Sequence, residues 1–473
     1  MQNTSYKTAL WGFSWEEALT EAPVQGIANL TDSGIMLDIP FGQLLSEPGH
    51  VVVGPEEQLP ESADYLYGFS QDGFWLVIKD CAFAGGSYSN PGGPSQKIRG
   101  SYLFASRSQF DSDGTVVEAR LGYRGLREWV DESPFRFQLG AEPSDAMQLT
   151  YGSADKEGYN KTIYSDEKLD ISILHDASFS FPTTAGSSIS HDCLLLINFK
   201  EGASFSQALD WIGSLSRFLS LCMGFLAEIT TVELMFEGCE NWVHCHFNCI
   251  KAQTSKIPDV NEMPFPYPKI SAHIALLLRN WLELEDRSKT AANIVISLLV
   301  EKTIPYIDLR FTAASQALEA FTKVNVSLLA EPKDSYASHK KRILDCIADP
   351  EDKEWFKAKC QGNQKGQRQL LNEFCEANED LVKCVVPDIE AFKKCQIDSR
   401  NYYTHRSGDE LGKQGNVLQG EQLYWHTQTV ILICYCFIWR CLGLDSQVII
   451  QAVEEPYFRP EVRQHAKKLY CSK

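Results

Sequence analysis

A proline-rich segment in the middle of the chain limits what the chain can fold into. Residues 258–268 contain four prolines in eleven positions. Proline disrupts both the interior of a helix and a central strand, because it lacks an N–H donor and its ring fixes φ. The chain has 473 residues, more than one ordinary core would use. We therefore expect two domains, over residues 1–265 and 270–473.

The first domain has the pattern of β structure. Short apolar runs lie between Gly, Pro, Asp and Ser residues, for example GIMLDIP (34–40) and GFWLVIKD (73–80). From Ser204 to Gly224 the apolar residues change to the spacing of a helix. The stretch Gly85–Gly100 is expected to be a long loop, and it lacks the Gly-Lys-Ser/Thr ending of a nucleotide-binding loop. We predict a β-rich, sandwich-like domain with one packed helix.

The second domain has the pattern of helices. After Pro305, apolar residues recur at spacings of three and four, as on an amphipathic helix: Ile307, Phe311, Ala314, Leu318 and Phe321. Pro387 is expected to open another helix with Gly408 as its C-terminal cap, and an apolar helix follows over Gln422–Leu442. The expected fold class is α+β, with an all-α helical bundle as the second domain.

Charge is distributed unevenly between the two parts. Residues 271–473 hold 27 basic and 27 acidic side chains, so the net charge of −18 lies entirely in residues 1–270. A protein that coats DNA needs a basic surface to neutralise phosphates. The composition argues against that class, and it makes the neutral second domain the better candidate for binding RNA.

The sequence also predicts the compartment. The start of the chain has no apolar signal segment, and the number of cysteines, fifteen, is odd. The apolar run from Thr429 to Trp439 is too short to cross a bilayer. We expect a cytoplasmic protein with reduced thiols and no contact with a membrane.

The sequence RNYYTH, from Arg400 to His405, combines a cation and a proton-transfer group near a helix end. Cleavage of RNA without a metal needs both, because a histidine moves the protons and an arginine stabilises the charged phosphate. Spacing alone is weak evidence, since a chain of this composition contains about one such match by chance. A second match, Arg459–His465, lacks a polar second residue and is followed by no apolar helix. We therefore favour Arg400 and His405.

Helix geometry limits how these two side chains act together. Five residues along a helix turn about 500° and rise about 7.5 Å, so the side chains point about 140° apart. Either the helix ends or bends before His405, or a second copy of the chain completes the site.

This region resembles the HEPN superfamily of helical ribonucleases, whose signature is Arg, a polar residue, three spacers and His before the last core helix. Arg400, Asn401 and His405 match it, and ASQALEAF (314–321) is similar to a core helix of that superfamily. The front part, especially SFSQALDWIGSLSRFLSLCMG (204–224), resembles the N-terminal domain of ApeA-type proteins.

The resemblance implies a metal-independent endoribonuclease of bacterial anti-phage defence, acting by abortive infection. His405 would be the general acid or base, Arg400 would stabilise the phosphate charge, Asn401 would orient the pair, and the products would carry 2′,3′-cyclic phosphate ends. It further implies a homodimer or higher oligomer with a composite site, RNA as substrate, a phage-derived trigger, and a first domain that senses or regulates. The alternative is an inactive HEPN-like module for dimerisation or RNA binding, coupled to a β-rich ligand-recognition domain.

Three further groups of residues leave alternatives open. Glu319 either supports the Arg–His site or is an ordinary helix carboxylate, solvated or ion-paired. A basic group either lines an RNA path or is a solvated surface: Lys340, Lys341, Arg342, Lys393, Lys394 and Arg406. Cys239, Cys245, His246 and Cys249 have the composition of a zinc site, but residues 243–249 alternate as on a strand, which separates the ligands. We predict no cofactor and no metal.

Overall fold

The computed structural model describes residues 4–6, 8–21, 23–31, 34–47, 59–89, 93–133, 135–138, 148–151, 160–180, 188–248, 256–301, 304–324, 326–359, 362–405 and 416–471. The chain forms two compact units. Unit 1 comprises Met1–Val260 and Pro266–Ala275, and unit 2 comprises Asn261–Phe265 and Leu276–Lys473. The predicted division into two separate folding domains remains a prediction.

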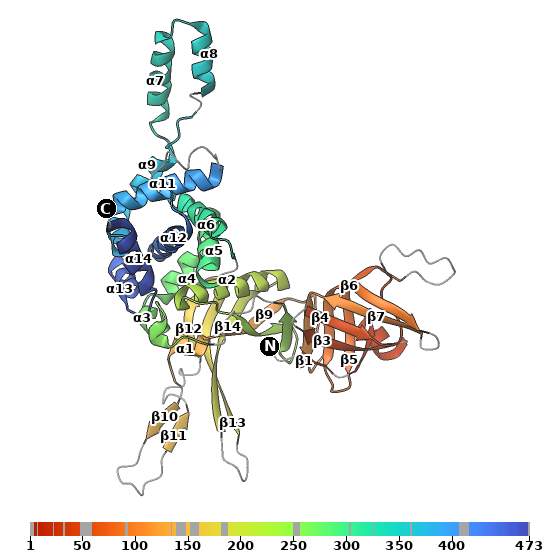
Figure 1. Cartoon of the computed structure of the whole chain (residues 1–473). Coiled ribbons are helices and arrows are strands. Elements are labelled where there is room, and N and C mark those ends of the chain that lie inside the picture. Colours follow the sequence, from red (N-terminus) through yellow and green to blue (C-terminus); the bar gives the residue numbers. More distant parts are fainter. Residues whose placement is uncertain are drawn as a thin grey trace. The chain divides into compact units, whose positions relative to one another are not determined.

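Most strands of unit 1 belong to one antiparallel sheet (Figure 1). In chain order they are β1 (Thr4–Ser5), β2 (Ala9–Gly12), β3 (Val24–Thr31), β4 (Gly34–Ile39), β5 (Ser62–Ser70), β6 (Trp75–Ser89), β7 (Gly93–Gly100), β8 (Tyr102–Ser106), β9 (Val116–Tyr123), β12 (Asn160–Ser165), β13 (Leu169–Ser180), β14 (Ser188–Ala203), β15 (Ile229–Phe236) and β16 (Val243–Phe247). A separate pair is formed by β10 (Phe135–Gln138) and β11 (Gln148–Tyr151).

Part of this sheet closes on itself. The pairings run β6–β5–β2–β3–β4–β7 and return from β7 to β6, and β6 also pairs with β8, from which the sheet continues to β12. Closure removes free strand edges, and the ring encloses apolar side chains that are completely buried, among them Trp11, Leu37, Leu66 and Ile98. The prediction of a β-rich unit is confirmed, and its strands form a closed ring that continues as a sheet where the sequence suggested a sandwich.

The predicted helix at Ser204–Gly224 is present as α2 (Phe205–Met223). The Ser204 side chain accepts a hydrogen bond from the Gln207 backbone, and the Gln207 side chain accepts one from the Ser204 backbone. Gly224 ends the helix with φ of 73°, a conformation that favours glycine. The other helices of unit 1 are α1 (Leu126–Val130), α3 (Tyr267–Ile270) and the π-helical turn η1 (Glu17–Glu21).

The expected loop at Gly85–Gly100 is wrong. Residues 82–89 of β6 pair with residues 93–99 of β7 as a hairpin. A Cβ on Gly86 would lie 2.8 Å from the carbonyl oxygen of Ser95 on the opposite strand. Glycine here therefore allows a close approach of two backbones, which in sequence is indistinguishable from a flexible loop.

Unit 2 is helical, as predicted. Its elements are η3 (Val260–Glu262), α4 (Ile274–Leu282), α5 (Asp286–Ile296), the π-helical turn η4 (Ser297–Glu301), α6 (Ile307–Phe321), α7 (Lys333–Cys346), α8 (Pro350–Lys359), α9 (Gln367–Ala377), α10 (Glu379–Val385), α11 (Ile389–His405), α12 (Gly420–Cys441), α13 (Ser446–Glu454) and α14 (Pro460–Cys471). Along the chain, η3 and α4 each begin in unit 1 and end in unit 2.

Helix α12 is the centre of this unit. Its residues from His426 to Trp439 are buried, and α12 packs against α5, α6, α10, α13 and α14. Helix α6 buries Phe311, Ala314, Leu318 and Phe321, which is the stripe that the sequence predicts. Within the described residues, no helix combines the length and the apolar character needed to cross a membrane.

Candidate active site at the end of helix α11

The RNYYTH sequence forms the last turns of α11. Arg400, Asn401, Tyr402 and Tyr403 are partly buried. His405 is the last residue of the helix, and the structure describes its backbone but not its side chain. Since the backbone stays helical through His405, the helix does not end before it. On a regular helix, positions 400 and 405 lie about 140° apart around the axis.

Arg400 forms an ion pair with Glu319 of the neighbouring helix α6. Arg400 Nε donates to Glu319 Oε1 at 2.6 Å, and only 23% of the Arg400 side chain and 22% of the Glu319 side chain are exposed. The Gln367 side-chain amide, at the start of α9, donates to the same carboxylate oxygen. Three helices thus hold this pair in place, and charge-assisted hydrogen bonds of this kind are the stronger ones in proteins.

Asn401 contacts the same guanidinium. Arg400 Nη1 donates to Asn401 Oδ1 at 3.4 Å. A guanidinium carries five N–H donors. The bonds to Glu319 and Asn401 use two of them, and among the residues that the structure describes no further acceptor is bonded to Arg400. The remaining donors are suited to an oxyanion such as a phosphate.

A buried polar network fixes α11 against α6 and α12. The Gln396 amide donates to Ser315 Oγ at 3.1 Å, and its carbonyl oxygen lies 2.9 Å from His426 Nε2. His426 Nδ1 lies 2.6 Å from the Tyr470 hydroxyl. Burial lowers the pKa of His426 to about 3, so the ring is neutral. Its Nε2–H therefore donates to Gln396, and Nδ1 accepts from Tyr470.

The same face of α11 is also held by an aromatic contact with α6 and by the chain that enters α12. The Tyr403 ring packs edge-on against Phe311, with centroids 5.6 Å apart, and its hydroxyl donates to the Leu418 carbonyl at 3.1 Å. The backbone N–H of Leu418 donates to Ser399 Oγ at 3.0 Å. The end of α11 is thus anchored by Ser399, just before Arg400 in sequence, and by Tyr403, shortly after it.

Sequence reasoning missed Gln367, Gln396 and His426. The available signal was a histidine inside an otherwise apolar helix, because a buried histidine needs polar partners. Nothing in the sequence indicated which residues those partners are.

The second Arg–His match has a structural role. Arg459 is partly buried, and it donates to the Leu299 carbonyl at 2.7 Å and to the Gln428 side chain at 3.1 Å. His465 stacks on Trp425 with ring centroids 3.7 Å apart. Arg459 is therefore engaged within the fold.

The sequence candidates for zinc do not gather among the described residues. On β16, Cys245 is buried, whereas His244 lies on the other face, 3.3 Å from Glu233. His246 Nε2 lies 2.9 Å from the Tyr6 hydroxyl, and Cys249 is outside the described residues. Within the described part of the chain, the group whose ligand atoms lie close enough to share one ion is His175, His191 and Cys193 in unit 1.

Among the described residues, the basic side chains suggested for an RNA path are not shown to form one cluster. Lys341 and Arg342 are exposed on α7, Lys393 on α11 forms an ion pair with Glu390 at 2.5 Å, and Arg406 lies outside the description. An RNA path along these residues remains a prediction.

Comparison with known protein families covers most of the chain. A family model described as ApeA N-terminal domain 1 matches residues 10–281, which is more than half of the chain. A second model, described as Apea-like HEPN, matches residues 312–448 and so includes Glu319, Arg400 and His405. No curated protein and no solved structure matches the chain. The chain belongs to the ApeA family, in which this N-terminal domain precedes a C-terminal HEPN domain.

Proposed function

We propose that this protein is a metal-independent endoribonuclease that acts in anti-phage defence by abortive infection. HEPN domains are generally ribonucleases, and the pairing with an ApeA N-terminal domain indicates a family of anti-phage nucleases. The observation that carries the proposal is the hydrogen bonding of the Arg400 guanidinium. Glu319 aligns its guanidinium from one side, and donors remain for a phosphate.

The proposed reaction is attack of a ribose 2′-OH on the adjacent phosphate. The bond between the 2′-oxygen and phosphorus forms, and the bond between phosphorus and the 5′-oxygen of the next nucleotide breaks. His405 removes the proton of the 2′-OH or supplies the proton to the leaving 5′-oxygen. The products are a 2′,3′-cyclic phosphate and a 5′-OH, and general acid–base catalysis of this kind contributes roughly 10²–10⁴-fold.

In this proposal Arg400 stabilises the negative charge that develops on the phosphate oxygens. Asn401 orients the guanidinium. Glu319 is a positioning residue, because it touches Arg400 and not the substrate. A second copy of the chain supplies the His405 that faces a given Arg400, since one helix directs the two side chains apart. The N-terminal domain senses a trigger or restrains the nuclease.

The test is RNA cleavage by the full chain in the presence of EDTA. The wild-type protein should cleave RNA to products with 2′,3′-cyclic phosphate ends, and His405→Ala should abolish cleavage. His465→Ala is the matched control, because it removes the histidine of the second Arg–His pair and should leave cleavage intact. Full cleavage by His405→Ala contradicts the proposal. Loss of wild-type cleavage in EDTA, while the circular-dichroism spectrum shows that the chain remains folded, also contradicts it.

The same variants distinguish the alternative function in cells. Cells that express the wild-type protein should resist phage, and infected cells should accumulate RNA with cyclic phosphate ends. Cells with His405→Ala could instead stay resistant without accumulating RNA with cyclic phosphate ends. That result would indicate the alternative, an inactive module for dimerisation or RNA binding.

A further inference from the structure

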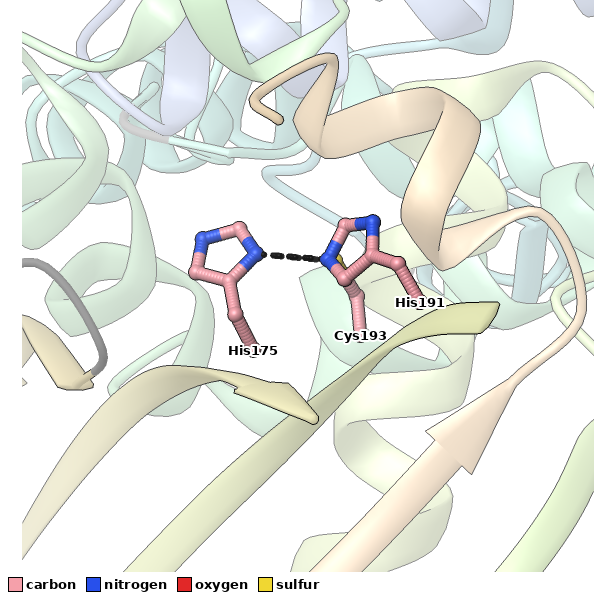
Figure 2. Close-up of side chains that lie close together, drawn as sticks. All are labelled: His175, His191 and Cys193. Carbon is pink, nitrogen blue, oxygen red and sulfur yellow. Dashed lines mark hydrogen bonds between the residues drawn. The ribbon is translucent and has the colours of Figure 1, made fainter. Parts of the chain in front are cut away.

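Three side chains that ligate metals meet on one face of the ribbon formed by β13 and β14. His175 is the register partner of Cys193, and His191 precedes Cys193 by two residues on the same strand. Alternate residues of a strand share a face, and register partners lie side by side. The local strand geometry thus places all three on one face. Figure 2 shows the two imidazole rings next to each other, with Cys193 beside them.

The distances between the ligand atoms are close to those around a zinc ion. His175 Nδ1 and His191 Nε2 are 3.0 Å apart, and Cys193 Sγ lies 3.5 Å from the first nitrogen and 3.6 Å from the second. In a tetrahedral site with Zn–N of about 2.05 Å and Zn–S of about 2.3 Å, two nitrogens are about 3.3 Å apart, and nitrogen and sulfur about 3.6 Å.

The type of the donors selects the metal. Two imidazoles and a thiolate suit zinc, whereas calcium and magnesium require oxygen ligands. His175 is 5% exposed and Cys193 is 1% exposed, so the group is shielded from water on the Cys193 side. His191 is half-buried and leaves a path for an ion to enter.

Carboxylates near the group supply negative charge. Glu132 acts electrostatically on both His175 and Cys193, and Glu128 acts on Cys193. Each also has a cationic partner: Lys161 lies 3.0 Å from Glu132, and Arg127 lies 2.8 Å from Glu128. Asp176 and Asp192 act on His191. Lys161 also acts on His175, and Arg127 acts on His191 and Cys193. The four carboxylates outnumber these two cations, and the net negative charge favours a cation at the group.

We propose that His175, His191 and Cys193 bind one zinc ion, with water as the fourth ligand. The ion joins β13 to β14 and thereby fixes their register. The proposed zinc site lies in unit 1, and the candidate active site lies in unit 2. It does not depend on the proposed ribonuclease activity.

The test measures metal bound to the full chain. Protein purified after growth with zinc should contain about one zinc per chain. After replacement of zinc by Co²⁺, it should show the thiolate-to-cobalt charge-transfer absorption and the intense visible bands of a tetrahedral site. Cys193→Ser should lose the charge-transfer absorption, and His191→Ala should bind zinc at least about 100-fold more weakly. His191 is half-buried, so His191→Ala is the variant expected to fold normally.

Cys245→Ser is the matched control. Cys245 is also a buried thiol on a strand of unit 1, and it lies outside the proposed ligand set. This variant should keep the zinc content and the cobalt spectrum of the wild type. Loss of zinc from Cys245→Ser with retention in Cys193→Ser would overturn the proposal in favour of the group around β16. A wild-type chain that shows no thiolate-to-cobalt absorption would also overturn it, and would leave His175 and His191 as a hydrogen-bonded pair.

Discussion

At the scale of single residues, the ion pair between Glu319 and Arg400 connects the fold to the proposed chemistry. The two residues are 81 positions apart in sequence, and the pair is mostly shielded from water. The sequence left open whether Glu319 supports the site or is an ordinary solvated or ion-paired carboxylate, and the observed ion pair is compatible with both. The partner of Glu319 is the arginine of the proposed site, so the interpretation as a supporting residue remains a prediction.

Replacing Glu319 by glutamine should slow RNA cleavage by roughly tenfold to a hundredfold, because the aligning charge on Arg400 is lost, at a cost of about 1.5–3 kcal/mol. Initial cleavage rates at saturating RNA measure this effect. Glu373→Gln is the matched control, since Glu373 forms an ion pair with Lys365 at 2.7 Å elsewhere in unit 2. Equal cleavage rates for Glu319→Gln and the control would contradict a positioning role.

His426 should make the folded state sensitive to acid. Burial lowers its pKa to about 3 in the folded protein, whereas an unfolded histidine has a pKa of about 6.5. Below pH 6.5 the unfolded chain therefore binds a proton that the folded chain does not. The stabilisation is complete above pH 6.5, and it falls by about 1.4 kcal/mol per pH unit as the pH decreases towards 3.

Urea unfolding between pH 7 and pH 5 measures this dependence. His426→Gln should lose about 2 kcal/mol less unfolding free energy over this range than the wild type, because one titrating group is removed. His273→Gln replaces an exposed histidine and should keep the wild-type dependence. If His426→Gln and the wild type have the same slope, His426 is not buried in the neutral form.

At the scale of elements, α2 and the hairpin of β6 and β7 show which local signals are reliable. The caps of α2, Ser204 and Gly224, lie at the predicted positions, because capping depends on residues within one turn. The glycine-rich hairpin was missed, because its regularity comes from hydrogen bonds to the opposite strand and not from its own side chains.

Ser204→Ala should lower the unfolding free energy by about 1 kcal/mol, since the backbone N–H of Gln207 loses its acceptor. Urea unfolding followed by circular dichroism measures the change. Ser206 is exposed and lies two residues further into the helix, so Ser206→Ala should have little effect. A loss of similar size in both variants would indicate that the Ser204 cap does not contribute.

At the scale of the whole molecule, the regular helix through His405 favours an active site shared between two chains. Such a site takes Arg400 from one copy and His405 from the other. Co-expressed Arg400→Ala and His405→Ala chains would then form mixed dimers in which one of the two sites is intact.

A mixture with random pairing should have about one quarter of the wild-type activity, because half of the dimers are mixed and half of their sites are intact. Chains with two different affinity tags allow the mixed dimers to be isolated and assayed. Two differently tagged Arg400→Ala chains are the control and should stay inactive. Inactive mixed dimers would contradict a site that combines residues of two chains.

The sequence by itself determined features that depend on near neighbours. These are the helical second half, the stripe on α6, the caps of α2 and the position of Arg400 and Asn401 in the last turns of a helix. Periodicity and capping act within a few residues, so a single sequence contains them.

Only the tertiary structure decided which distant residues meet. It closed the ring of strands through β6 and β7, paired Arg400 with Glu319, and placed His175 beside His191 and Cys193. Each contact joins elements that share no local pattern, and it forms because the surrounding apolar side chains pack in one way. The physical reason is that the apolar pattern of a helix or strand decides which of its faces is buried, whereas tertiary packing decides which other element covers that face.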